Sequence, residues 1–164
     1  MSAKESTEQA LREQVAKLLD WGEAHAEWKE SVEKFPEKDR GRRPEGAPHS
    51  AWELLEHARI AQWDILEFSR DAKHKSLNWP DDYWPKSAEP TRDAAWQESV
   101  KQFEADRRAM QKLVKDPETD LFAAIRHGKG QTILREALLL ADHNAYHLGQ
   151  LVLVRRMLGD WKKG

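Results

Sequence analysis

Cysteine is absent from the 164-residue sequence, which excludes disulfides, thiolate metal ligands and a cysteine nucleophile together. Long apolar runs are also missing, because no stretch approaches the ~18 apolar residues of a membrane-spanning helix. The first residues, MSAKESTEQALREQ, are charged and polar where a signal peptide would carry an apolar stretch of about 7–15 residues. These absences predict a cytoplasmic protein that does not enter a membrane.

Neither sign of charge is in large excess. The sequence has 27 Lys and Arg against 29 Asp and Glu, which gives a net charge of -2. A nucleic-acid-binding protein is expected to carry a basic excess or a basic stripe, so we expect no nucleic-acid partner. The length fits one domain on a prior of about 100–200 residues. The sequence therefore predicts a single domain over residues 1–164.

Four stretches place apolar residues at steps of three, four and seven, which is the pattern of amphipathic helices. They cover residues 5–34, 50–73, 91–114 and 131–158. No window alternates apolar and polar residues as a strand would. We therefore predict an all-α fold, a four-helix bundle, in which the last and most apolar helix is the most buried.

The expected helix starts and the longest loops carry further signals. Ser50 and Glu53 have the spacing of a capping box, and Thr91 is a good N-cap residue for the third helix. Both connections that flank the second helix exceed the roughly two to eight residues usual between antiparallel helices in a bundle. We expect the aromatic loop between the second and third helices to pack down and to cover the mouth of a pocket. Its apolar residues are Trp79, Pro80, Tyr83, Trp84 and Pro85.

Two histidines stand out on the last predicted helix. His143 and His147 are four residues apart, so both imidazoles lie on one helical face about one turn apart. Seven randomly placed histidines would give roughly 0.3 such pairs, so the spacing alone is a weak motif. Two hydrogen-bonded histidines in a polar seam are an equal alternative on this spacing. A metalloprotease helix needs Glu after the first histidine, and Asn144 in that place argues against it.

A third histidine favours a metal site. His57 lies on the apolar stripe of the second predicted helix, and burying three imidazoles without partners would cost several kcal/mol. Neutral imidazole is a ligand for zinc, nickel, copper or iron. Three protein ligands with an open fourth position are typical of a catalytic metal site. We therefore predict a divalent metal bound by His57, His143 and His147.

Carboxylates on neighbouring turns are candidates for orienting these ligands, because a metal-bound histidine usually donates its other N–H to a carboxylate, carbonyl or water. The carboxylates on suitable faces are Glu53, Asp64 and Glu136. The capping box is an alternative role for Glu53. His25 on the first helix could line the cavity, although a lone helical histidine more often has a packing or surface role.

The histidine pattern resembles the DinB-like superfamily of four-helix-bundle metalloproteins. The resemblance rests on His57 in HSAWELLEHARIAQWD and on the H-x-x-x-H pair, His143 and His147, in LADHNAYHLGQLV. It implies an up-down-down-up bundle that is often dimeric. It also implies that these histidines bind a divalent metal, most commonly zinc or nickel. Some relatives, the bacillithiol S-transferases and the mycothiol-dependent isomerases, use the metal to activate a low-molecular-weight thiol.

Two classes of function follow. The first is a metal-dependent transferase or hydrolase that activates a thiol or water toward a small-molecule substrate. The second is a non-catalytic, stress-related bundle protein whose histidine cluster binds a structural metal or an organic ligand. In either case the Trp-rich bundle leads us to expect a homodimer.

Overall fold

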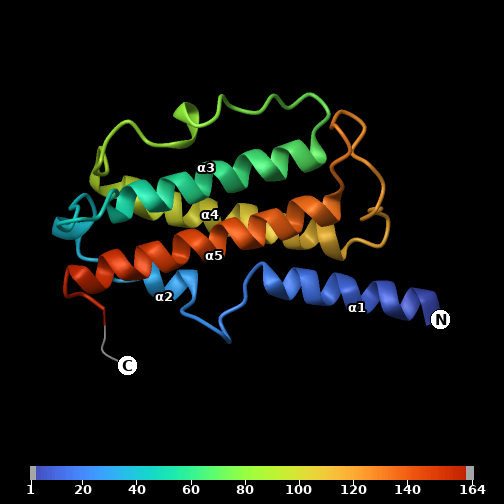
Figure 1. Cartoon of the computed structure of the whole chain (residues 1–164), viewed down its shortest axis with the longest axis horizontal. Helices are drawn as coiled ribbons and strands as arrows, with labels where there is room; N and C mark the ends of the chain where they lie inside the picture. Colours follow the sequence, from blue (N-terminus) through green and yellow to red (C-terminus); the bar gives the residue numbers. More distant parts are fainter. Residues whose placement is uncertain (1–2, 162–164) are drawn as a thin grey trace.

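The computed structural model describes residues 3–161, and the long helices lie side by side along one axis (Figure 1). The α-helices are α1 (Ala3–Leu18), α2 (Trp28–Val32), α3 (Ala51–Arg70), α4 (Asp93–Lys115) and α5 (Ile133–Met157). Short 3-10 turns occupy Glu37–Asp39 (η1) and Asp81–Tyr83 (η2). Between residues 3 and 161 there is no strand, only an isolated bridge that pairs Ala124 with Thr132. The all-α prediction is confirmed.

The long connections set the directions of the helices. The segment 71–92 leaves the end of α3, returns along the length of that helix and delivers the chain to the start of α4 (Figure 1). Helices α3 and α4 therefore run in the same direction, and α1 and α5 run in the opposite one. Helix α3 packs against both α4 and α5. None of the helices within residues 3–161 is long and apolar enough to cross a membrane.

Side-chain caps define the starts of α3 and α5. The Ser50 hydroxyl accepts from the backbone N–H of Glu53 at 3.2 Å, and the Glu53 carboxylate accepts from the backbone N–H of Ser50 at 2.8 Å. The predicted capping box is thus confirmed. At α5, the Thr132 hydroxyl accepts from the backbone N–H of Arg135 at 3.1 Å. These caps satisfy backbone donors that have no partner within the helix.

The predicted N-cap of the third helix is wrong by one residue. Arg92, not Thr91, occupies the N-cap position, and α4 begins at Asp93 without a side-chain cap. Arg92 instead pairs with Glu98 one and a half turns into the helix. Both side chains of this pair are exposed, so it replaces no hydroxyl cap and contributes little to the start of α4.

The prediction of one continuous first helix over residues 5–34 is also wrong. Helix α1 ends at Leu18, and the chain resumes a helix only at Trp28, which begins α2. Gly22 lies in the break, and glycine disfavours a helix interior by about 1 kcal/mol relative to alanine. The break lets Trp28 turn into the core, where its ring lies 4.4 Å from that of Phe103. Tertiary packing therefore overrides the helical period here.

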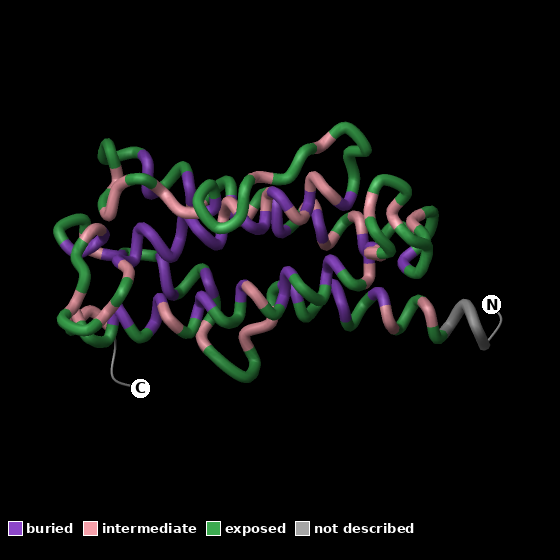
Figure 2. Tube along the Cα trace, turned by 45° about the horizontal axis from the view of Figure 1, so that its top comes forward, coloured by how far each residue is buried: buried purple, intermediate pink, exposed green. Residues whose placement is uncertain are grey.

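The core has two apolar clusters along the bundle, and buried positions line the inner sides of the helices (Figure 2). One cluster joins α2 and the first half of α3 to the second half of α5, and the other joins α1 to the first half of α5. Helix α3 has 13 buried residues out of 20, whereas α5 has 12 out of 25. The prediction that the last helix is the most buried is wrong, because α5 also carries exposed apolar residues.

Candidate functional site

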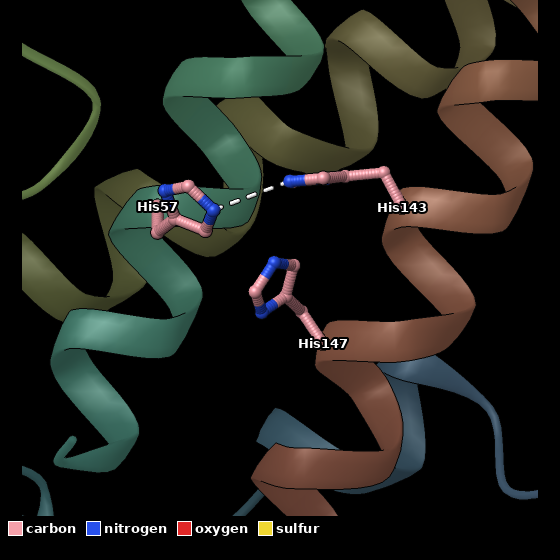
Figure 3. A group of neighbouring side chains, drawn as sticks. All are labelled: His57, His143 and His147. Atoms are coloured by element: carbon pink, nitrogen blue, oxygen red, sulfur yellow. Dashed lines mark hydrogen bonds between the residues drawn. The ribbon is translucent and has the colours of Figure 1, made fainter. Parts of the chain in front are cut away.

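Three histidines from two helices converge in the middle of the bundle (Figure 3). His57 comes from α3, and His143 and His147 come from successive turns of α5. One ring nitrogen of each lies within 4.8 Å of the others. His57 and His147 are buried, and His143 is half-buried. The predicted proximity of these three side chains is therefore confirmed.

The spacing of the nitrogens fits a shared ion. The Nε2 atoms of His57 and His143 are 3.2 Å apart, and the ring of His147 lies below them with one nitrogen turned toward the pair (Figure 3). A tetrahedral site with metal–nitrogen distances of about 2.0–2.1 Å separates its ligands by about 3.3–3.4 Å. The pair is thus already close to the separation that a zinc-like ion imposes.

Hydrogen bonds to the outer nitrogens select the tautomer of two rings. His57 Nδ1 lies 2.9 Å from the backbone carbonyl of Tyr83, and His147 Nδ1 lies 2.7 Å from the Gln150 side-chain oxygen. Both partners are acceptors, so each Nδ1 carries the hydrogen and donates it. The Nε2 atoms of both rings are therefore left with lone pairs, as metal ligands require.

The third ring has an unused polar atom. Among the residues that the structure describes, His143 Nδ1 is buried without a hydrogen-bond partner. Without a metal, the tautomer of His143 with its hydrogen on Nε2 is favoured. That hydrogen can then be donated to the Nε2 lone pair of His57, 3.2 Å away. Ligation by His143 Nε2 would require this hydrogen to move to Nδ1.

Burial keeps the cluster neutral. Burial lowers the pKa of His57. Burial, followed by repulsion from His57, lowers the pKa of His143 to about 4. Burial also lowers the pKa of His147 to about 3, with His143 and His57 adding to the effect. All three imidazoles are therefore uncharged at neutral pH, the state in which their nitrogens can bind a cation.

An aromatic stack fixes the plane of His57. The Trp84 ring lies parallel to the His57 ring at a centroid distance of 3.9 Å, and His49 stacks on the other face of Trp84 at 4.1 Å. Tyr83, next to Trp84 in the segment 71–92, is buried, so this segment packs down on α3 as predicted. Trp79 in the same loop is 68% exposed and remains at the surface.

Asp64 lies beside the cluster but is bonded elsewhere. Its carboxylate accepts from the Tyr83 hydroxyl at 2.7 Å and lies 2.7 Å from His74 Nε2. Burial raises the pKa of the Tyr83 hydroxyl, and Asp64 adds to this effect. Asp64 therefore acts on His57 only indirectly, by anchoring the residue whose carbonyl accepts from the His57 ring.

The other two predicted carboxylates also have partners outside the cluster. Glu53 completes the capping box and forms an ion pair with Arg43 at 2.5 Å. Glu136 pairs with Arg135 at 2.6 Å. Within residues 3–161, no hydrogen bond joins Glu53, Asp64 or Glu136 to a ring of the cluster. A carbonyl and an amide, rather than carboxylates, orient the histidines.

His25 does not join the cluster. It is exposed and lines a different pocket, between the α1–α2 break and α5, which it shares with Trp21 and Trp28. The surface role favoured for His25 is therefore confirmed, and the alternative that it lines the histidine cavity is wrong.

Sequence reasoning missed most of the residues that support the cluster. Gln150 was detectable, since it follows His147 by three positions and so shares its helical face. The Tyr83 carbonyl had no sequence signal, because every residue has a carbonyl and 26 positions separate it from His57. The Trp84–His49 stack likewise joins two loops whose approach depends on the whole fold.

A pocket opens next to His143. It has a volume of about 330 Å³ and lies between α3, α5 and the segment 71–92. Asp64 and Tyr83 line it together with His143, so it begins at the edge of the cluster. A small molecule in this pocket could therefore reach the histidines.

Comparison with known proteins gives a family. A model of the DinB superfamily matches residues 8–151, which is most of the chain and includes all three histidines. No curated protein and no solved structure matches the sequence. The matched range contains both helices, α3 and α5, that supply His57, His143 and His147. The chain belongs to the DinB superfamily.

Proposed function

We propose that His57, His143 and His147 bind one divalent metal ion, zinc or nickel, in a metal-dependent enzyme. The observation that carries this proposal is the convergence of three neutral imidazoles whose ligand nitrogens lie within 4.8 Å of one another. Two of them already present Nε2 lone pairs, because their Nδ1 hydrogens are donated to Tyr83 and Gln150. Three histidines with a remaining open position are the ligand set of catalytic zinc sites.

The chain's own groups would prepare the site before any ion arrives. Trp84 holds the plane of His57, and Gln150 holds the ring of His147. Burial keeps the second proton off all three rings, so no imidazolium has to be deprotonated when an ion binds at neutral pH. Preorganisation of this kind lowers the cost of binding, because few rotamers have to be ordered.

The reaction we favour is activation of a low-molecular-weight thiol or of water, as in an S-transferase or a hydrolase. A divalent ion supplies a Lewis acid that lowers the pKa of such a group. The pocket beside His143 offers the place for a small-molecule substrate. Asp64 and Glu136 line this pocket, but each is already bonded, so neither is free to act as a general base without breaking a contact.

Elemental analysis of protein purified without a histidine tag tests metal binding. We expect about one equivalent of a divalent metal per chain, as one three-histidine site predicts. The double variant H143A/H147A should lose it, and H25A is the matched control because His25 is an exposed histidine outside the cluster. Metal that persists in the double variant, or is absent from the unmodified protein after incubation with zinc and nickel, would refute the proposal.

A second candidate function is a non-catalytic bundle protein in which the cluster holds a structural metal or an organic ligand. The observation that favours it is the engagement of all three nearby carboxylates in other contacts. The two functions differ in a thiol-dependent assay with an electrophilic acceptor. Turnover that depends on the metal supports the enzyme, whereas a large fall in melting temperature on chelation without any turnover supports the structural role.

We also propose that the chain forms a homodimer through an exposed apolar face of α5. The face contains Leu138, Tyr146, Leu153 and Met157, which repeat at helical spacing and are 43%, 65%, 56% and 48% exposed. Burying such a face is favourable. Light scattering coupled to size exclusion should show a dimer for the unmodified protein and a monomer for L153E. Phe122 is also 56% exposed but lies off this face, so F122E should remain dimeric.

The remaining parts of the proposal concern topology and setting. We take the helix directions as an up-down-down-up bundle, the arrangement expected for this superfamily. We place the protein in the cytoplasm, acting on a small molecule and not on nucleic acid. The nearly balanced charge supports the last point, and a gel-shift assay with DNA and RNA should show no binding at physiological salt.

A further inference from the structure

The pocket beside His143 has mainly apolar walls. Helix α3 contributes Ile65 and Phe68, α5 contributes Leu139, and the segment 71–92 contributes Trp79. Its volume of about 330 Å³ is at the lower end of the roughly 300–1,000 Å³ of small-molecule sites. Leu139 is 37% exposed and Trp79 is 68% exposed, so these two apolar side chains lie where a ligand would remove them from water.

The charged groups in the pocket wall are already compensated by the protein. Asp64 accepts from the Tyr83 hydroxyl and contacts His74, each at 2.7 Å. Arg135 and Glu136 pair with each other at 2.6 Å. A charged ligand would have to break one of these contacts or lose hydration without gaining a counter-charge, and both carry a cost. A neutral ligand meets neither penalty.

Aromatic side chains line much of the apolar surface. Phe68 approaches from the helix side, and the rings of Trp79 and Tyr83 pack edge to face, with centroids 5.1 Å apart. A flat ring entering the pocket could stack on or pack edge-on against these side chains, the arrangements that aromatic pairs prefer. The walls are therefore suited to an aromatic body more than to a flexible polar one.

We infer that this pocket binds a neutral aromatic body of the substrate, with the reacting group directed toward His143. The position of the reacting group rests on the proposed function, but binding of the aromatic body does not require a metal. The specificity of the site would then come from Leu139, Phe68 and Trp79, while the histidine cluster serves the chemistry.

Metal-free protein titrated with three probes of one shape tests the inference. Naphthylmethanol is neutral, naphthoate is an anion and naphthylmethylammonium is a cation. Binding is followed in nitrogen-15 spectra through the indole N–H of Trp79, assigned with W79F. We expect naphthylmethanol to bind most tightly. Tighter binding of either charged probe, or no shift of the Trp79 signal up to the solubility limit of naphthylmethanol, would overturn the inference.

Two leucines of similar exposure give a matched pair of variants. Leu139 lines the pocket and is 37% exposed, whereas Leu18 of α1 is 39% exposed and does not line it. Loss of apolar contact equivalent to one methylene weakens binding about fourfold, so L139Q should bind naphthylmethanol about fourfold less tightly and L18Q should match the unmodified protein. Equal weakening in both variants contradicts the assignment. Because no metal is present, failure here is distinct from failure of metal binding.

Discussion

Replacement of Gln150 by leucine is expected to weaken metal binding without unfolding the protein. The Gln150 side-chain oxygen lies 2.7 Å from His147 Nδ1 and holds the hydrogen on that nitrogen. In Q150L the hydrogen is free to move to Nε2, which removes the lone pair that would face the ion. Loss of such an orienting partner typically lowers metal affinity about 10–100-fold, or about 1.4–2.7 kcal/mol.

A competition titration of metal-free protein against a colorimetric zinc chelator measures this change. Q150E is the informative partner variant, because a carboxylate also accepts from Nδ1 and makes the imidazole a stronger ligand. It should therefore bind zinc at least as tightly as the unmodified protein. Q97L, at an exposed glutamine of α4, should not change the affinity. If Q150L binds zinc as tightly as the unmodified protein, or if Q150E is weakened as much as Q150L, the orienting role of Gln150 is refuted.

Three further outcomes concern stability. In metal-free protein the free energy of unfolding should fall as pH drops from about 7 to about 5, because unfolded histidines take up protons near pH 6.5. His143 and His147 stay neutral in the fold until about pH 4 and about pH 3. Denaturant titrations at each pH check this, and a value that rises over the interval contradicts it. D64A should lower the free energy of unfolding by about 1–3 kcal/mol for each donor left buried without its acceptor. An unchanged free energy of unfolding in urea titrations would contradict this. S50A should cost about 0.5–2 kcal/mol through loss of the N-cap, and an unchanged melting curve in circular dichroism would show that the cap contributes little.

Helical periodicity and the family resemblance together predicted the histidine cluster. His57 lies on the apolar stripe of α3, and His143 and His147 lie on the inward face of α5. Inward faces of packed helices meet, so periodicity places these side chains in the same interface, although the level at which they meet along the bundle depends on the whole fold. The same reasoning predicted the all-α class and the Ser50 capping box, since both depend on short-range patterns.

What depends on long-range packing could not be predicted. The break between α1 and α2 follows from the fit of Trp28 against Phe103, which outweighs a local apolar period that continues through it. The carboxylates failed as orienting groups for a similar reason. Asp64 lies two turns after His57 on α3, as expected, and lines the pocket, but its carboxylate is bonded to His74 and Tyr83 from the segment 71–92.

X-ray absorption at the metal edge of the zinc-loaded, untagged protein tests the central claim most directly. The account predicts that imidazole scattering fits three histidine ligands, with zinc–nitrogen distances of about 2.0–2.1 Å. It also predicts that the spectrum of H57A fits fewer histidine ligands, because His57 is the ligand supplied by α3. A first shell composed only of oxygen, or a spectrum unchanged by H57A, would contradict the assignment of this cluster as a metal centre.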